Sequence, residues 1–347
     1  VTTYLGAGNN IYASEQNLYI AVSGYRGFNT GRRMKTIPLY GADKTLLYKF
    51  SLTKGAMTYL CKGEVPGTIL NQYSMDENGN NLRIATTSYS NSDHVMQNNV
   101  YVTDELLNVT GKLENLAPGE RIYSVRFMGE RAYVVTFRNV DPLFVIELKG
   151  SSNPKVLGAL KIPGYSNYLH PYDDKHIIGF GKDTVDGKGG TAYYMGLKMA
   201  MFDVSDVEKP VEMFTEKIGD RGTDSEVLNN PKALLFSKEK NLLALPVTLM
   251  EIKDGGKTKS EFPEYGRFVF QGAYVYNIDL LNGFKLKGRI THLGRDDIEK
   301  AGDYWYQSPL NIDRILYIDD MLYTLSQRFI KANDIKDLTE KKTLQIP

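Results

Sequence analysis

The sequence predicts an all-β protein built from a repeated four-stranded sheet, and three observations support this prediction. The 347 residues include 32 glycines and 24 tyrosines, which suit short strands joined by tight turns. A short apolar run recurs along the chain at uneven spacing. Long segments with helical periodicity are absent from the sequence. An internal repeat of this kind decides the fold, because each unit needs neighbours to bury its apolar faces.

The recurring run is interpreted as the second strand of each unit. It begins at Leu18, Leu82, Ala132, His176, Leu242 and Leu322. A first strand that ends in a short polar turn is predicted before it, at residues 10–14, 71–76, 123–129, 232–237 and 314–319. Such turns are typical of β-hairpins.

Third and fourth strands complete each unit. Third strands are predicted at residues 46–52, 100–104, 143–148, 199–204, 273–279 and 329–333. Fourth strands are predicted at residues 57–65, 108–113, 155–162, 211–218, 284–290 and 343–346. One short helix is expected at residues 296–301, so the chain consists of six antiparallel four-stranded units.

Four-stranded sheets with two apolar faces bury both faces when they pack radially around an axis, which is a β-propeller. We therefore predict one β-propeller domain over residues 1–347, most simply with six blades. The blades extend approximately over residues 9–65, 70–116, 121–163, 166–218, 231–292 and 312–347. The alternatives are a seventh blade that uses residues 1–8 and further sequence, and a pair of β-sandwiches.

Long insertions group on one predicted face. In each unit, the turns from the first to the second strand and from the third to the fourth strand are short. The loops from the second to the third strand and the crossings between blades are long. These insertions are residues 24–44, 88–99, 182–196, 219–231, 248–272 and 292–313. Long loops on one face of a rigid scaffold favour a binding or chemical role, and the alternative is tolerated drift.

Composition excludes several classes of protein. Lys and Arg number 42 and Asp and Glu 41, so there is no basic excess that indicates nucleic acid or a membrane surface as partner. No apolar run approaches the roughly 18 residues of a spanning helix, so the protein is not expected to span a membrane. The one cysteine, Cys61, excludes an internal disulfide framework and a cysteine-clustered metal site.

Several segments carry a resemblance to a known family. They are residues 63–77, 82–87, 119–129, 133–137, 140–144, 153–158, 168–171 (Tyr-Leu-His-Pro) and 202–206 (Phe-Asp-Val-Ser-Asp). Together they span essentially the whole chain. The chain resembles secreted prokaryotic proteins with a C-terminal β-propeller domain distantly related to WD40 repeats. The resemblance implies export, and a propeller that follows another N-terminal region, but no catalytic residues.

The sequence departs from this family pattern in two places. Relatives tend to have Asp-His-Lys-Ala where this chain has Asn-Asn-Pro-Lys-Ala at residues 229–233. They tend to have Asp-Leu-Ser-Asp-Pro where this chain has Glu-Leu-Lys-Gly-Ser at residues 147–151. A role for the missing histidine is therefore lost here.

Polar residues recur on or near the predicted innermost strands, and strand alternation directs some of them into the central channel. They are Asn71, Gln72, Ser124, Arg126, Asn167, His170, Lys232 and Arg314. A cationic channel would attract an anionic ligand or an acidic side chain of a partner. The alternative is that these cations pair with Asp76, Asp141 and Asp313 between blades, since buried charges are normally paired.

Two further groups are candidates for binding at the channel mouth. Arg138 and Asp141, with Arg221 and Asp224 of the crossing at residues 220–226, predict a polar rim, or else a structural network of ion pairs. Trp305 lies in an aromatic cluster at residues 303–306. Exposed aromatic side chains anchor carbohydrate or protein ligands, and buried ones fill gaps between blades.

Metal and cofactor signals are weak. Asp183 and Asp186 precede Gly189 in a segment that faintly resembles the start of a calcium loop. The third acid and the terminal glutamate of such a loop are missing, which favours a polar loop. No cofactor is therefore predicted, with calcium as the one alternative. The sequence contains no P-loop, Rossmann fingerprint or Gly-x-Ser-x-Gly elbow.

We expect an extracellular or cell-surface binding or scaffolding module that uses the loop-rich face around the channel. Its partner is expected to be a protein or a cell-envelope polysaccharide, and not a nucleic acid. The alternative is a hydrolase or lyase that acts on polysaccharide or peptide at the channel mouth. An enzyme requires paired carboxylates, or a nucleophile and a base within hydrogen-bond reach. A third hypothesis is an internal part of a longer envelope protein without a ligand of its own.

Overall fold

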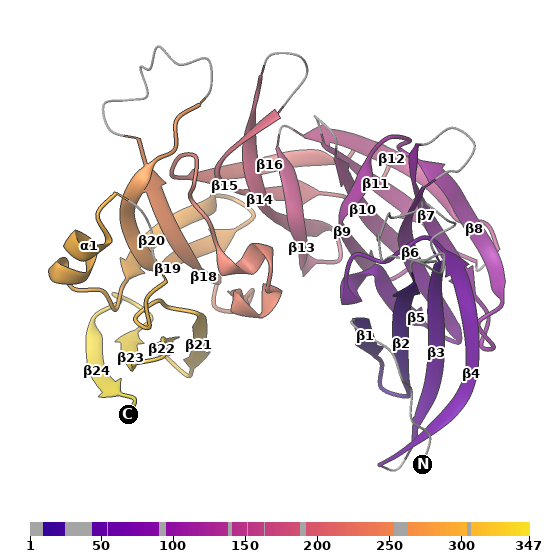
Figure 1. Cartoon of the computed structure of the whole chain (residues 1–347), viewed down its shortest axis with the longest axis horizontal. Helices are drawn as coiled ribbons and strands as arrows, with labels where there is room; N and C mark the ends of the chain where they lie inside the picture. Colours follow the sequence, from indigo (N-terminus) through magenta and orange to yellow (C-terminus); the bar gives the residue numbers. More distant parts are fainter. Residues whose placement is uncertain are drawn as a thin grey trace, which may run out of the picture. The chain divides into compact units, whose positions relative to one another are not determined.

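The computed structural model describes residues 10–24, 44–53, 55–89, 95–137, 141–150, 152–162, 164–187, 192–252, 263–303 and 307–347. Within these residues the chain forms six four-stranded antiparallel sheets and one α-helix (Figure 1). In each sheet, the strands are neighbours in the order in which they follow along the chain. The predicted all-β fold with six four-stranded units, as in a six-bladed propeller, is thereby confirmed.

The chain divides into two compact units. Unit 1 comprises residues 1–161 and 206–210, and unit 2 comprises residues 162–205 and 211–347. Each unit contains three of the sheets.

Unit 1 begins with the sheet of β1 (Asn10–Ala13), β2 (Asn17–Gly24), β3 (Lys44–Thr53) and β4 (Ala56–Pro66). The next sheet follows the 3-10 turn η1 (Gln72–Ser74) and contains β5 (Met75–Asn78), β6 (Asn81–Tyr89), β7 (Met96–Thr103) and β8 (Val109–Leu116). The last contains β9 (Arg121–Met128), β10 (Arg131–Phe137), β11 (Asp141–Glu147) and β12 (Lys155–Ile162).

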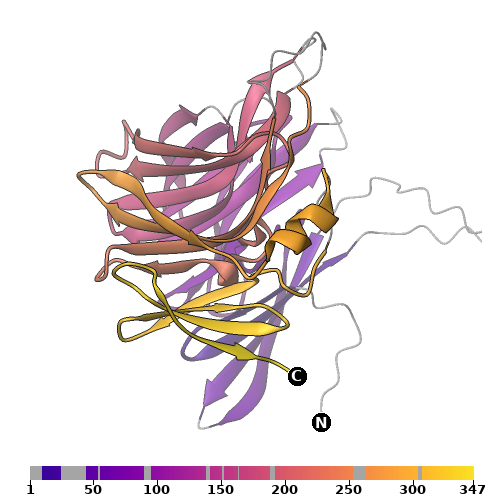
Figure 2. The same ribbon diagram turned by 90° about the vertical axis from the view of Figure 1, so that its left-hand side faces the viewer.

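Unit 2 begins with the sheet of β13 (Tyr165–Asp173), β14 (His176–Asp186), β15 (Ala192–Asp203) and β16 (Val211–Ile218). The turns η3 (Glu226–Leu228) and η4 (Pro231–Ala233) lead to β17 (Leu235–Ser237), β18 (Leu242–Glu251), β19 (Arg267–Asp279) and β20 (Gly283–Ile290). Helix α1 (Arg295–Ala301) contacts β19 and lies beside this sheet in Figure 2. The last sheet contains β21 (Arg314–Ile318), β22 (Met321–Leu325), β23 (Phe329–Asp334) and β24 (Glu340–Gln345).

The recurring apolar run forms the buried centre of each unit. In β6, residues 82–86 are all buried, because neighbouring sheets cover both faces. Ala85 and Val100 of one sheet pack in the same core as Val125 and Val134 of the next. The last strand of a sheet is far more exposed, and every residue of β24 is exposed. Burial of apolar area between sheets, at about 25 cal/mol per Å², is therefore what holds neighbouring sheets together.

Three predicted insertions are in part strand, and at residues 88–99 strand β6 continues to Tyr89 and β7 begins at Met96. Strand β14 continues to Asp186 and β15 begins at Ala192, with Val185 paired to Tyr193. The predicted loop at residues 182–196 was therefore too long, because β-forming residues flank its glycine-rich centre. Strands β18 and β19 likewise extend into the predicted insertion at residues 248–272, as far as Glu251 and from Arg267.

Two predicted first strands begin with a 3-10 turn instead. At residues 71–76, the Asn71 side chain accepts a hydrogen bond from the Tyr73 N–H and begins η1, so the strand starts only at Met75. At residues 232–237, Pro231 opens η4 and the strand starts at Leu235. Asn as a cap and Pro in the first turn both favour helical starts over strands.

Candidate functional site

The first strands of unit 1 surround a pocket of about 330 Å³, which we name the Arg126 pocket. It is lined by Ile11, Tyr12, Ala13, Gln72, Tyr73, Met75, Asp76, Arg126 and Phe127. Each of the three sheets of unit 1 contributes to it. The pocket brings together two of the predicted residues, Gln72 and Arg126. None of its lining residues comes from the predicted insertions.

Arg126 lies on β9, and its guanidinium carbon lies 5.5 Å from the centre of the Tyr73 ring. Its Nε is buried and has no hydrogen-bond partner. No residue in the described part of the chain forms an ion pair with it. The aromatic ring supplies a cation–π contact, which fixes the guanidinium but does not neutralise its charge. The pocket therefore contains a positive charge without a counter-ion from the described residues.

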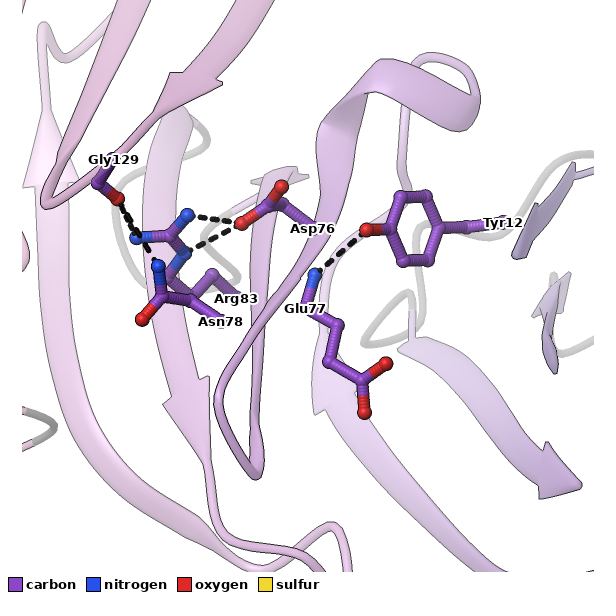
Figure 3. A network of polar contacts seen from close by, with 6 residues as sticks. All are labelled: Tyr12, Asp76, Glu77, Asn78, Arg83 and Gly129. Carbon is purple, nitrogen blue, oxygen red and sulfur yellow. Dashed lines mark hydrogen bonds and ion pairs between the residues drawn. The ribbon is translucent and has the colours of Figure 1, made fainter. Parts of the chain in front are cut away.

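Asp76, in the same pocket, is neutralised by another arginine. Arg83 is 4% exposed, and its Nε donates to Asp76 Oδ2 at 2.8 Å, with a second bond from Nη2 (Figure 3). Its Nη1 donates to the carbonyl oxygen of Gly129, which also accepts from Asn78 Nδ2. Asp76 therefore pairs with Arg83 of its own sheet, and not with one of the predicted inner-strand cations, while the network ties the β5–β8 sheet to the β9–β10 turn.

A second network ties the β1–β4 sheet to the β5–β8 sheet. The Tyr12 hydroxyl accepts a hydrogen bond from the Glu77 N–H at 3.1 Å (Figure 3). The Glu77 carboxylate accepts from Tyr19 Oη at 2.7 Å and from Asn17 Nδ2 at 2.6 Å. Burial raises the pKa of Tyr12, so its hydroxyl stays protonated at neutral pH. The three walls of the Arg126 pocket are therefore fixed to one another.

Asn71 and Gln72 have different positions. Asn71 caps η1 through its side-chain oxygen, 3.0 Å from the Tyr73 nitrogen, so its role is to position the turn. Gln72 follows it, is exposed, and lines the pocket. The turn thereby places the Gln72 amide and the Tyr73 ring beside Arg126.

Unit 2 contains a second pocket of about 400 Å³, which we name the Asp313 pocket. It is lined by Asp224, Ser225, Glu226, Asn229, Pro246, Thr248, Gln271, Gln307, Asn311, Ile312 and Asp313. Burial, and then the charge of Glu226, raise the pKa of Asp313, while Arg314 opposes them. The Asn311 Oδ1 is buried without a hydrogen-bond partner among the described residues. This pocket is rich in hydrogen-bond acceptors.

Asp224 and Arg221 are the predicted rim residues that the structure describes. Asp224 lines the Asp313 pocket and forms an ion pair with Lys182 Nζ at 2.8 Å. The Arg221 guanidinium carbon lies 4.1 Å from the Tyr265 ring centre and 5.5 Å from that of Tyr193. Its Nη1 donates to a backbone carbonyl. Arg221 therefore has local partners and does not line either pocket.

The other predicted residues lie apart from the pockets or outside the described residues. His170, on β13, contacts the Tyr168 hydroxyl through Nδ1 at 2.9 Å and the Phe236 ring edge-on. Asp183 pairs with Lys217 at 2.7 Å, which opposes the calcium interpretation. No group of three acidic, histidine or cysteine side chains suited to a metal occurs within the described ranges. Residues outside the description are Arg138, Trp305, and the side chains of Asp141 and Asp186.

Sequence reasoning missed several residues of the pockets. Tyr12 and Tyr73 line the Arg126 pocket. Each lies in a predicted first strand, and Tyr73 follows the selected Gln72, but nothing else in the sequence marks either tyrosine as a pocket residue. Gln271 and Asn311 line the Asp313 pocket and lie inside predicted insertions. Because these insertions were predicted to be loops, the sequence provided no strand or helix periodicity from which to predict where their side chains point.

The comparisons with known proteins agree with the six sheets. The Beta propeller domain family matches residues 1–338, and the chain belongs to this family. An uncharacterised protein of Methanocaldococcus jannaschii is 38% identical over 266 residues, which are 76% of this chain and 35% of that protein. An uncharacterised protein of Archaeoglobus fulgidus is 38% identical over 241 residues, or 68% of this chain and 36% of that protein. The chain thus spans about a third of the length of these relatives.

Solved structures similar to the chain include propellers. The WD40 domain of Neurospora crassa Pan2 aligns with 98% of this chain and 78% of its own, at 9% identity and a TM-score of 0.47. The β-propeller domain of the trilobed protease from Pyrococcus furiosus aligns with 97% of this chain and 82% of its own, at 9% identity and a TM-score of 0.41. Within the described residues, no helix is long and apolar enough to cross a membrane.

Proposed function

We propose that this chain is the binding or scaffolding propeller of an exported or cell-surface protein, and that the Arg126 pocket is its recognition site. The observation that carries the proposal is the Arg126 guanidinium, which lines a pocket between three sheets without an ion-pair partner among the described residues. A ligand that supplies the missing counter-ion would bind there. The loop-bearing face is proposed as an additional contact surface.

The cost of leaving a guanidinium partly buried and unpaired supports this proposal. Among the described cations of low exposure, Arg83 pairs with Asp76 and Lys198 with Glu212 at 3.0 Å, and Lys49 donates to the Glu105 backbone carbonyl at 3.2 Å. A charged group that lacks a partner loses hydration without recovering it. The surroundings are also fixed, because interactions between the sheets hold the pocket walls. Such preorganisation lowers the entropy that a ligand must lose on binding.

The proposed location outside the cell rests on the family resemblance. An antibody against the native protein would test it by surface labelling and by fractionation of the source organism. Recovery in the envelope or the medium is the expected result. Recovery only from the cytoplasm would contradict it.

Site-specific cross-linking tests the recognition role. A photo-reactive amino acid at Gln72, an exposed residue of the pocket, would be activated in the presence of envelope and secreted proteins. The same group at Leu106, which is 59% exposed in unit 1 and outside the pocket, is the matched control. We expect a discrete adduct from position 72 that is absent from position 106. Identical products from both positions would contradict the role of the pocket.

A second candidate function is cleavage of a polysaccharide or peptide in the Asp313 pocket. The observation that favours it is that Asp313, whose pKa is raised by burial and then by the charge of Glu226, lines the same pocket as the Glu226 carboxyl group, since hydrolases use pairs of carboxyl groups as acid and base. Incubation with a panel of polysaccharides and peptides tests it. Product formed by the native chain and abolished in Asp313→Asn would establish it. Absence of product across the panel would contradict a hydrolytic role for the Asp313 pocket.

A further inference from the structure

We infer that the Arg126 pocket receives a carboxylate, supplied by an acidic side chain of a partner protein. This inference rests on the proposed recognition role of the pocket and names the group that is recognised.

The charge of the pocket favours an anion with a single charge. Its charged lining residues are Arg126 and Asp76. Asp76 is paired with Arg83, so that Arg126 supplies the positive charge that lacks a counter-ion. Arg126 can therefore neutralise one negative charge on a ligand, and a second negative charge would have no partner in the lining. A carboxylate, with one charge, suits this balance better than a phosphate dianion does.

The geometry of Arg126 suits a carboxylate as well. A guanidinium presents its N–H donors in a planar fork that binds both oxygens of a carboxylate. The Tyr73 ring centre, 5.5 Å from the guanidinium carbon, restrains that plane, and because Nε is buried, a ligand would meet the fork at its terminal Nη groups. The exposed Gln72 amide lines the same pocket and can donate a further hydrogen bond to the bound group.

The apolar part of the lining favours a protein as the source, although more of the accessible lining is polar. Met75 and Phe127 form part of the wall but are only 2% and 8% exposed, so they present little surface to a ligand. Ile11, also part of the lining, is 51% exposed. A sugar acid would place hydroxyl groups against these apolar atoms, which would cost their hydration. A peptide places its own apolar side chains there, as in the core of a protein interface.

Titration of the whole chain with short peptides tests the inference. The probes are acetyl-Gly-Gly-Glu-Gly-Gly-amide and the same peptide with Gln, with glucuronic acid and inorganic phosphate as the other arms. Binding is followed through the Nε–Hε NMR signals of arginine, assigned by substitution. Arg126→Gln removes the fork, and Arg126→Lys retains only the charge. Arg121→Gln is the matched control, since Arg121 lies exposed on the same strand and outside the pocket.

We expect the glutamate peptide to shift the Arg126 Nε–Hε signal and to bind at least tenfold more tightly than the glutamine peptide. Arg126→Gln should weaken binding of the glutamate peptide at least tenfold, Arg126→Lys should bind it more weakly than the native chain, and Arg121→Gln should leave it within a factor of two. Equal binding of both peptides, or tighter binding of phosphate, would overturn the carboxylate. Tighter binding of glucuronic acid would overturn the protein source. Melting curves establish that each variant is folded.

Failure of this inference is distinguishable from failure of the proposed function. If cross-linking at Gln72 captures a partner and Arg126→Gln captures it equally, the pocket recognises a partner but not through a carboxylate. If the glutamate peptide binds as expected but no adduct forms at Gln72, the carboxylate site stands and the scaffolding role fails.

Discussion

Arg83 and Arg126 show how the surroundings of a guanidinium decide its role. Both lie in unit 1, Arg83 on β6 of the β5–β8 sheet and Arg126 on β9 of the β9–β12 sheet. Arg83 has a carboxylate and a backbone carbonyl as partners and is almost fully buried. Arg126 has an aromatic ring and a pocket. The first arginine is therefore assigned to stability and the second to binding.

Replacing Arg83 should destabilise unit 1 strongly. Arg83→Met leaves Asp76 without its donor and the Gly129 carbonyl with only the Asn78 amide, and loss of one partner of a largely buried pair costs about 3 kcal/mol. Urea denaturation measures this change in the free energy of unfolding. The control is Lys112→Met, because the exposed pair of Lys112 with Glu114 contributes below about 1 kcal/mol. Equal losses in the two variants would show that the network is not stabilising.

At the scale of residues, the sequence selected some of the residues that line the pocket, but it did not predict what each of them does. Position on an inner strand was enough to select Gln72 and Arg126, because the first strands of unit 1 border the pocket. Asn71 was selected for the same reason and is a cap. Whether an arginine meets an acid from another sheet depends on the packing of sheets that are distant in sequence, and strand periodicity carries no information about that packing.

At the scale of elements, close contacts between strands make some glycines irreplaceable. Gly181 on β14 faces the backbone of β13, and a Cβ there would lie 1.6 Å from the Tyr165 carbonyl oxygen. The two strands cannot pair in this register with any larger residue. The strand pattern predicts that β14 exists, but not which of its residues must be glycine.

Gly181→Ala should therefore cost at least about 3 kcal/mol of unfolding free energy, or prevent folding. Gly55→Ala is the control: nothing lies within 4 Å of its Cβ, so only the strain of its φ of +77° remains, about 1 kcal/mol. Thermal melting of both variants measures the difference. A Gly181→Ala protein as stable as Gly55→Ala would mean that β13 and β14 separate more easily than this contact implies.

Strands were predicted more accurately than the segments between them. The fourth strands at residues 155–162 and 211–218 agree with β12 and β16 at both ends. The extended hairpin of β14 and β15 was missed, since its ends flank a glycine-rich segment that resembles a loop.

Metal removal tests the remaining calcium alternative at this scale. Because Asp183 is paired with Lys217, we expect EDTA to leave the melting temperature unchanged. A decrease that calcium reverses would contradict this expectation and would restore the segment around Asp183 as a calcium site. The measurement is differential scanning fluorimetry with and without calcium.

For the molecule as a whole, pH should act on stability through His292. This histidine is 7% exposed and lies between the Ser326 and Thr324 hydroxyls, 2.9 Å from each. Burial, then the charge of Lys331, lower its pKa to about 4, while Glu340 opposes them. As the pH falls below about 6.5, His292 becomes protonated in the unfolded chain, whereas in the folded chain it becomes protonated only near pH 4. Stability is therefore lost over this interval.

Between pH 7 and pH 5 the loss should be about 2 kcal/mol, since one unit of pKa shift corresponds to about 1.4 kcal/mol. Urea denaturation at the two pH values measures it. An NMR titration of His292 checks the cause directly. A midpoint near 6.5 for this residue in the folded protein would contradict the explanation.

The six-sheet architecture was predicted from the repeat, and the family match confirms it. The sequence predicted the function less specifically than the fold, because propellers serve many functions and the residues of the site decide between them. The chain spans 35% and 36% of the lengths of its two relatives. What unit 1 contributes is a rigid pocket with an unneutralised cation.

The most direct test of that claim is a crystal structure of the chain with the glutamate peptide. We predict electron density for the peptide in the Arg126 pocket, with a carboxylate oxygen within hydrogen-bond distance of a terminal Nη of Arg126. A structure in which the Arg126 guanidinium is paired with an acidic side chain of its own chain, and the peptide is absent from the pocket, would contradict the account.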